Sequence, residues 1–198
     1  MSTVERAAAA LQAGELVVIP TDTVYGLACR PDDEEAVHAL TALKRRSPVQ
    51  PIALVAAGIE PLRALVPELV GVTLVAGAFT LVVSNPARRL PWLSGPRPDT
   101  IGVRIPLVEG LAAELLGHVG VVAATSANLH GGADPQRVAD VPAEILAGVD
   151  AVLDVGALPG TPSTVVDLTG AEPRVLREGA VPAAEALARF RSADNRAK

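Results

Sequence analysis

The sequence predicts a single α/β domain of 198 residues built on a mixed sheet. Short apolar runs typical of buried strands are interspersed with stretches long enough for helices. They follow no regular strand–helix–strand rhythm, which favours parallel and antiparallel strands in one sheet over a doubly wound parallel sheet. Hydrophobic residues make up 49% of the chain, and neither a linker nor an internal repeat is visible. We therefore expect one domain over residues 1–198, with a core at about 5–181 and a C-terminal helix and short tail at 182–198.

The first elements have clear local signals. Ser2 and Glu5 fit a capping box that opens a helix, and Gly14 ends it. Apolar runs at residues 16–20 and 24–29 predict two buried strands.

The next stretch predicts a helix followed by a shorter strand. The acidic pair at 32–33 can cap a helix over residues 34–45, whose basic end suits the negative pole of the helix dipole. Residues 52–55 are a short apolar strand. Two helical stretches broken by Pro67 come before a strand at 79–83.

The second half alternates apolar runs with loops rich in Gly, Pro and polar residues. We expect loops at residues 85–98 and 125–135. The expected strands are residues 101–105, 121–124, 151–153, 164–168 and 174–176, and the expected helices are residues 108–116, 143–147 and 183–189.

Charge, cysteine and lysine content exclude several kinds of site. The net charge of −5 argues against an overall nucleic-acid footprint, although a local basic groove stays open. Cys29 is the only cysteine, so neither an internal disulfide nor a thiolate metal cage can form, and its apolar strand predicts a packing role. No Gly-Lys pair exists, which excludes a P-loop. We expect no metal-ligating residues.

We expect a cytoplasmic protein without membrane contact. Glu5 and Arg6 interrupt the region where a signal peptide needs an apolar run. The longest uncharged stretch, residues 69–86, is shorter than the ~20 apolar residues of a spanning helix.

Polar residues gather where predicted strands end, at residues 21–23, 125–128 and 163–164. Clefts of open sheets form beyond strand ends, so these residues are candidates for ligand contacts as well as for turns. Arg104 interrupts an apolar strand and must be paired, because burying a lone guanidinium is costly. Its partner could be a ligand carboxylate or an internal salt bridge.

The run Lys44-Arg45-Arg46 is the densest basic segment. Such a run can be a solvated helix end or part of a phosphate site, with Arg177 as a second cation. The residues alone therefore indicate an anion-binding cleft without naming its substrate.

Six segments together resemble the YrdC-like threonylcarbamoyl-adenylate synthase family. They are PTDTVYGL (20–27), KRRSPVQPI (44–52), TIGVRIP (100–106), TSAN (125–128), STVVDL (163–168) and LREG (176–179). The resemblance runs from about residue 16 to 181 and is to the short form, without the extra C-terminal domain of longer members. It implies a twisted mixed sheet with flanking helices and a concave, positively lined cavity.

The resemblance also implies an activity. The family is a group of nucleotidyltransferases that join L-threonine, bicarbonate or CO2, and ATP into threonylcarbamoyl-AMP with release of pyrophosphate. The product serves N6-threonylcarbamoyladenosine modification at position 37 of tRNA. Mg²⁺ would accompany ATP, downstream tRNA-modifying transferase proteins would be partners, and contact with double-stranded RNA or tRNA is open.

Carried over by position, the family's site residues fall into three sets. The threonine site would be Thr23, Arg104 and Ser163. The ATP site would be Lys44, Arg46, Gln50, Thr100, Ser126, Asn128, Asp134 and Arg177. Lys44, Arg46 and Arg104 would be catalytic.

The sequence departs from the family pattern at several positions. Ser47 and Thr125 replace prolines, Gln50 stands where Asn or Lys is common, and Val55 stands where some members use His. The segment at residues 75–80 keeps only a Gly and a Thr of the WPGPLT pattern. Two alternatives therefore stay open: a non-catalytic paralogue that binds double-stranded RNA or tRNA, and a carbamoyl-adenylate enzyme with a different acceptor.

Overall fold

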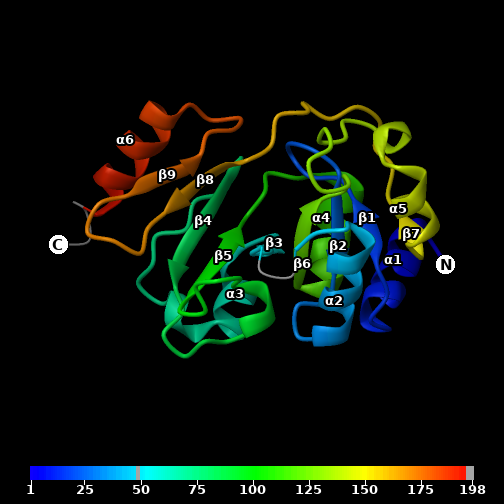
Figure 1. Cartoon of the computed structure of the whole chain (residues 1–198), viewed down its shortest axis with the longest axis horizontal. Coiled ribbons are helices and arrows are strands. Elements are labelled where there is room, and N and C mark those ends of the chain that lie inside the picture. Colours follow the sequence, from blue (N-terminus) through cyan, green and yellow to red (C-terminus); the bar gives the residue numbers. More distant parts are fainter. Residues whose placement is uncertain (48–49, 195–198) are drawn as a thin grey trace.

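The computed structural model describes residues 1–47 and 50–194, so positions 48–49 of the segment 44–52 and most of the predicted tail, residues 195–198, lie outside it. In the described residues, nine strands form one sheet in the order β7-β1-β2-β6-β3-β5-β4-β8-β9 (Figure 1). The strands are β1 (Val17–Ile19), β2 (Gly26–Cys29), β3 (Ala53–Ala56), β4 (Phe79–Ser84), β5 (Thr100–Arg104), β6 (Val121–Ser126), β7 (Ala151–Val152), β8 (Thr164–Asp167) and β9 (Arg174–Arg177).

The sheet is mixed, which confirms the predicted fold class. The pairs β1–β7, β3–β5 and β4–β8 are parallel. The pairs β1–β2, β2–β6, β3–β6, β4–β5 and β8–β9 are antiparallel. A sheet of this kind needs both hairpins and crossover connections, which explains the irregular order of strands and helices in the sequence.

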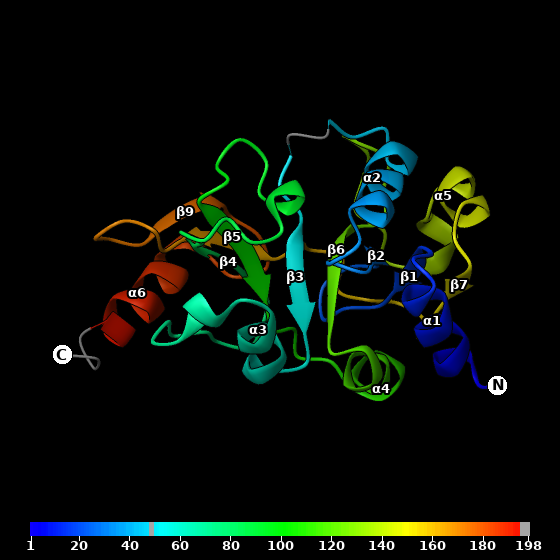
Figure 2. The ribbon, with the colours of Figure 1, turned by 90° about the horizontal axis from the view of Figure 1, so that it is seen from below.

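Helices flank the sheet, as Figure 2 shows from below. The α-helices are α1 (Thr3–Gln12), α2 (Glu34–Leu43), α3 (Ile59–Leu65), α4 (Gly110–Val119), α5 (Ala143–Ala147) and α6 (Ala183–Asp194), and the 3-10 helices are η1 (Pro67–Leu69), η2 (Pro91–Leu93) and η3 (Val138–Asp140). The expected capping box is present, with Glu5 N donating to Ser2 Oγ at 3.1 Å and Ser2 N to Glu5 Oε2 at 2.7 Å. Local signals therefore placed the α-helices well, whereas η2 lies where a loop was expected and η3 lies where no element was predicted.

Two apolar clusters make up the core. One lies under α1 and α4, which contact each other, and includes Leu11 and Leu115. The larger includes Tyr25, Leu40 and Cys29. Burial raises the pKa of the Cys29 thiol to about 12, so this thiol packs as an apolar group, as expected. Within the described parts of the chain, no helix is long and apolar enough to cross a membrane.

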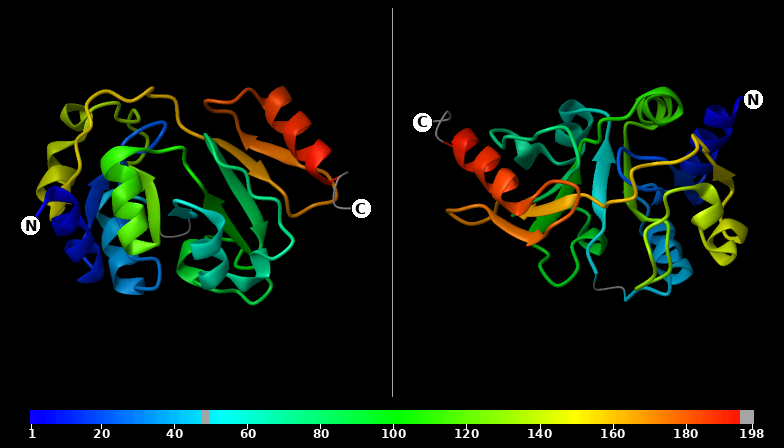
Figure 3. Two further views of the ribbon diagram at one scale, coloured as in Figure 1. Left: turned by 180° about the vertical axis from the view of Figure 1, so that it is seen from behind. Right: turned by 90° about the horizontal axis from the view of Figure 1, so that it is seen from above.

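A long connection joins β7, near one edge of the sheet, to β8, near the other (Figure 3). The hydroxyl of Tyr25 accepts from Val155 N at 3.0 Å and lies 2.8 Å from the carbonyl oxygen of Gly156. Further along, Gly160 N donates to the carbonyl oxygen of Thr23 at 2.8 Å. These bonds fix the connection to the turn between β1 and β2. The connection then leads to Ser163, just before β8.

Candidate active site

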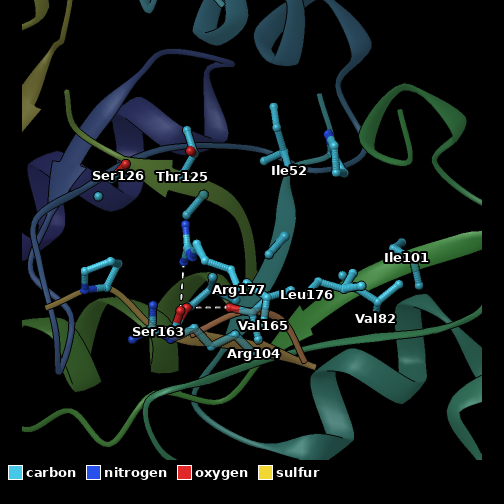
Figure 4. Close-up of a pocket in the computed structure, with 18 of the residues that line it drawn as sticks. Ile52, Val82, Ile101, Arg104, Thr125, Ser126, Ser163, Val165, Leu176 and Arg177 are labelled. Carbon is cyan, nitrogen blue, oxygen red and sulfur yellow. Dashed lines mark hydrogen bonds between the residues drawn. The ribbon is translucent and has the colours of Figure 1, made fainter. Parts of the chain in front are cut away.

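The candidate site is a cavity of about 360 Å³ on one face of the sheet (Figure 4). Alternate residues of a strand share a face, and this cavity takes Thr100, Gly102 and Arg104 of β5 together with Thr80 and Val82 of β4. Among the described residues, the charged groups that line the cavity are all guanidinium groups, hydroxyl groups lie beside them, and no carboxylate is present. The arginines are Arg46, Arg97, Arg104 and Arg177, and the hydroxyls are those of Thr21, Thr80, Ser94, Thr100, Thr125, Ser126 and Ser163.

Arg104 makes an internal salt bridge, one of the two possibilities that the sequence left open, and it also lines the cavity. Its Nη2 makes a salt bridge to Asp22 and donates to Thr23 Oγ1 at 2.8 Å. The same Asp22 accepts from Leu107 N at 3.0 Å, so the carboxylate is fixed from two sides. Yet Arg104 also lines the cavity, and its buried Nε has no partner in the described residues. Burial, the largest effect, lowers the pKa of Arg104, while Asp22 acts in the opposite direction.

Ser163 lines the same cavity as Arg104. Its hydroxyl is 2.8 Å from Thr80 Oγ1, and its carbonyl oxygen accepts from Arg177 Nη2 at 2.8 Å. Thr80 is the threonine kept from the segment at 75–80. Ser163 therefore contacts both the Thr80 hydroxyl and the Arg177 guanidinium, and these contacts hold the three side chains together at one part of the cavity wall.

Arg46 approaches from the loop after α2. Its three nitrogens donate to Gln50 Oε1 at 2.6 Å, Thr125 Oγ1 at 2.9 Å and the carbonyl oxygen of Pro51 at 2.9 Å. Burial and then the positive charge of Arg177 lower the pKa of Arg46. The departures at Gln50 and Thr125 thus supply acceptors that hold this guanidinium in place.

Lys44 does not line the cavity. Its ammonium is buried and contacts the carbonyl oxygens of Ser126 and Asn128, the second at 2.5 Å, and Asn128 Oδ1 at 3.0 Å. Ser126 Oγ donates to the same Asn128 oxygen at 2.7 Å. Burial is the main reason that the pKa of Lys44 falls to about 8, with Arg46 lowering it further and Asp134 opposing. The lysine fixes the loop that follows β6.

Sequence reasoning found most of this cavity but not all of it. Six predicted residues line it: Arg46, Thr100, Arg104, Ser126, Ser163 and Arg177. Four lie one hydrogen bond away from a lining residue: Thr23, Lys44, Gln50 and Asn128. Asp134 acts on the site through the charge of Lys44.

Residues missed by the prediction include Arg97, Ser94 and Thr80. Arg97 donates to Asp167 Oδ2 and Thr169 Oγ1, both at 2.8 Å. Arg97 and Ser94 lie in the Pro-rich loop before β5. This loop has no hydrophobic periodicity from which the direction of its side chains could be predicted. Thr80 falls on a strand predicted as apolar.

No group of three metal-ligating side chains occurs in the described residues. The described lining of the cavity offers a ligand guanidinium and hydroxyl groups.

Comparison with known proteins shows which protein family the chain belongs to. The Sua5/YciO/YrdC family model, described as "Telomere recombination", matches residues 9–179. The chain belongs to this family. A protein of Mycobacterium tuberculosis H37Rv is 38% identical over 182 residues, covering 88% of this chain and 83% of that protein. The threonylcarbamoyl-AMP synthase of Chromohalobacter salexigens is 36% identical over 180 residues, covering 84% and 92%.

The fold agrees with a solved member of the family. Sua5 of Pyrococcus abyssi, crystallised with L-threonine, matches with a TM-score of 0.77 and 31% identity over 90% of this chain. The match covers 54% of that Sua5 chain, so this chain corresponds to about half of its length.

Proposed function

We propose that this protein is a nucleotidyltransferase that forms threonylcarbamoyl-AMP from L-threonine, bicarbonate or CO2, and ATP. The observation that carries the proposal is the cavity itself, in which Arg46, Arg104 and Arg177 converge and no carboxylate lines the described walls. Such a cavity suits two anions at once, an amino-acid carboxylate and a triphosphate. The threonylcarbamoyl-AMP synthase name of the 36% identical relative and the threonine complex of Sua5 support the same activity.

Threonine fits the end formed by Arg104 and Ser163. Arg104 lines the cavity while Asp22 keeps its guanidinium in place, so a carboxylate would bind the part of the guanidinium that faces the cavity. The hydroxyls of Ser163 and Thr80 lie beside it for further hydrogen bonds.

The chemistry then needs alignment more than a covalent nucleophile. The neutral threonine amine attacks the carbon of CO2 and loses a proton, which gives a carbamate. A carbamate oxygen attacks the α-phosphorus of ATP, the bond from that phosphorus to the bridging oxygen breaks, and pyrophosphate leaves with the electron pair. Arg46 and Arg177 stabilise the charge on the phosphates during this exchange. Mg²⁺ would accompany ATP and neutralise part of the charge of its phosphates.

The product would supply the threonylcarbamoyl group for adenosine 37 of tRNA, which needs downstream transferase proteins. We place this activity in the cytoplasm, where ATP and tRNA are both present. The alternatives make different predictions. A paralogue that only binds RNA would show salt-sensitive RNA binding without ATP turnover. An enzyme with another acceptor would release pyrophosphate with a different amino acid.

The test is pyrophosphate release by the purified protein, with ATP, threonine and bicarbonate omitted in turn. Release must require all three. A panel of other amino acids covers the different-acceptor alternative. Arg104→Met should impair the use of threonine and Arg46→Met the use of ATP, whereas Arg88→Met, an exposed arginine outside the cavity, serves as the matched control. Release without threonine, or none with all three substrates, would refute the proposal.

A further inference from the structure

The hairpin of β8 and β9 contains a β-bulge at the edge of the cavity. The register is regular at Val166, which pairs with Val175, but Val165, the residue before it, lies opposite Arg177. Leu176 is therefore the extra residue of the bulge. The bulge lies where β9 reaches the cavity, because Val165, Leu176 and Arg177 all line it (Figure 4).

The bulge decides which face of the sheet Arg177 occupies. Residues directly opposite each other in an antiparallel pair share a face, and successive residues of a strand alternate between faces. Val165 lines the cavity, whereas its neighbour Thr164 is fully buried and is not among the described residues that line it. An unbroken register would pair Arg177 with Thr164 and turn the guanidinium away from the cavity. The shift by one residue pairs Arg177 with Val165 instead and so directs the guanidinium into the cavity.

The hydroxyl of Thr164 holds the segment that follows the bulge. It accepts hydrogen bonds from Gly179 N at 3.0 Å and Val181 N at 3.1 Å, and it donates to the carbonyl oxygen of Val181 at 2.5 Å. A hydroxyl has one donor and two acceptor positions, so these three bonds use all of them. Because Gly179 is two residues after Arg177, this hydroxyl fixes the backbone directly beyond the bulge.

Gly179 allows this segment to approach the neighbouring backbone closely. A Cβ added at Gly179 would lie 2.2 Å from the carbonyl oxygen of Pro162 and 2.6 Å from the carbonyl carbon of Ser163. Both atoms belong to the backbone, so no change of side-chain rotamer could make room for it. Ala180 N donates to the same Pro162 oxygen at 2.8 Å. The segment after the bulge is thus held against the backbone just before β8.

We infer that Thr164 and Gly179 are positioning residues for Arg177, because they maintain the bulge that turns its guanidinium into the cavity. In the described part of the chain this guanidinium makes one hydrogen bond, so its position depends on the backbone that carries it. Thr164 faces away from the cavity and Gly179 has no side chain, so neither acts by touching a substrate. The inference rests on the proposed function, in which Arg177 binds the triphosphate, and adds the residues that place it there.

Two substitutions disturb the bulge by different means. Thr164→Val keeps the shape of the side chain and removes its hydroxyl, whereas Gly179→Ala keeps the hydrogen-bonding groups and forces the two backbone segments apart. Each should raise the Kd of ATP, measured by calorimetric titration in the presence of Mg²⁺, by about 5- to 10-fold. The effect should be smaller than that of Arg177→Met, because the guanidinium is displaced and not removed. Urea unfolding of each variant shows that it is folded under the conditions of the titration.

Double variants show whether the effect acts through Arg177. In the Arg177→Met background, Thr164→Val and Gly179→Ala should each change the Kd of ATP by less than about 2-fold, because the group that they position is gone. A full further loss of affinity in that background would show that they act on the site by another route, and the inference would be wrong.

Two controls separate positioning from a general loss of stability. Thr164→Ser keeps the hydroxyl and loses a methyl group, so it should bind ATP with the wild-type Kd at a lower urea midpoint. Val166→Ala truncates a fully buried residue of the same strand that does not line the cavity, and it should also lower the midpoint without changing the Kd. If either control loses as much affinity as Thr164→Val does, lost stability explains the effect and the inference fails.

Failure of the inference differs from failure of the proposed function. Binding of ATP at the wild-type Kd by both Thr164→Val and Gly179→Ala would overturn the inference, whatever the pyrophosphate assay shows. A wild-type protein that binds ATP but releases no pyrophosphate with threonine and bicarbonate would refute the proposed function, and the binding measurements would still decide the role of the bulge. If wild-type protein does not bind ATP, both fail.

Discussion

Replacing Arg177 should weaken nucleotide binding while leaving the empty protein nearly as stable. Among the described residues, the side chain of Arg177 makes one hydrogen bond, to the carbonyl oxygen of Ser163 at 2.8 Å. Burial lowers the pKa of both Arg46 and Arg104, and the positive charge of Arg177 lowers both further, so Arg177 repels these two cations when no ligand is bound. Arg177→Met removes the bond and the repulsion together. The free energy of unfolding should therefore change by no more than about 1 kcal/mol.

When ATP is bound, relief of the repulsion between arginines no longer offsets the loss of Arg177. A hydrogen bond to a charged group contributes about 1.5–3 kcal/mol, and the exposed position of Arg177 favours the lower part of that range. We expect the Kd of ATP to rise by about 10- to 30-fold. Arg174→Met is the matched control, because Arg174 is an exposed arginine of the same strand and does not line the cavity.

The assay pairs calorimetric titration of ATP with urea unfolding of both variants. The expected pattern is a loss of affinity in Arg177→Met alone, at nearly unchanged unfolding free energy. Equal affinities in the two variants would show that Arg177 does not contact the phosphates. A loss of stability above about 2 kcal/mol would show that its role is structural instead.

Three further substitutions test other parts of the site. Asp22→Asn leaves the buried Arg104 guanidinium unpaired, so the free energy of unfolding should fall by about 3 kcal/mol in urea titrations; an unchanged midpoint would contradict the salt bridge. Thr125→Val removes a hydrogen-bond acceptor of Arg46, so the Kd of ATP measured by calorimetry should rise by about 3- to 5-fold. An unchanged Kd would show that Thr125 does not orient Arg46 for ATP. Lys44 has a folded-state pKa of about 8, below the unfolded value near 10.4, so the unfolded chain binds more protons between these values and stability rises with pH there. The unfolding free energy of wild type relative to Lys44→Met should thus increase by roughly 2–3 kcal/mol from pH 7.5 to 10, and a flat difference would refute the lowered pKa.

Elements with strong local signals were predictable from the sequence. The capping box of Ser2 and Glu5 and the acidic cap of α2 by Asp33 depend on residues three apart, and both are present. Apolar runs located the strands for the same reason. Arg104 stood out because a guanidinium in an apolar strand demands a partner.

Contacts between distant segments could not be predicted in this way. Asp22 and Arg104 are 82 residues apart, and nothing local indicates that they pair. The inward turn of Lys44 onto the carbonyl oxygens of Ser126 and Asn128 likewise depends on how α2 packs against β2, the neighbour of β6 in the sheet. Ser94 lies in a Pro-rich loop, where only the fold shows that its hydroxyl is buried and has no partner in the part of the chain that the structure describes.

The central claim is that one cavity joins an amino acid, a one-carbon unit and an adenylate. It is tested most directly by mass spectrometry of the small molecules formed from ATP, threonine and ¹³C-bicarbonate. We predict an adenylate that carries both threonine and the labelled carbon, formed by wild type and lost in Arg104→Met. Turnover of ATP that yields no adenylate containing the label would contradict the account.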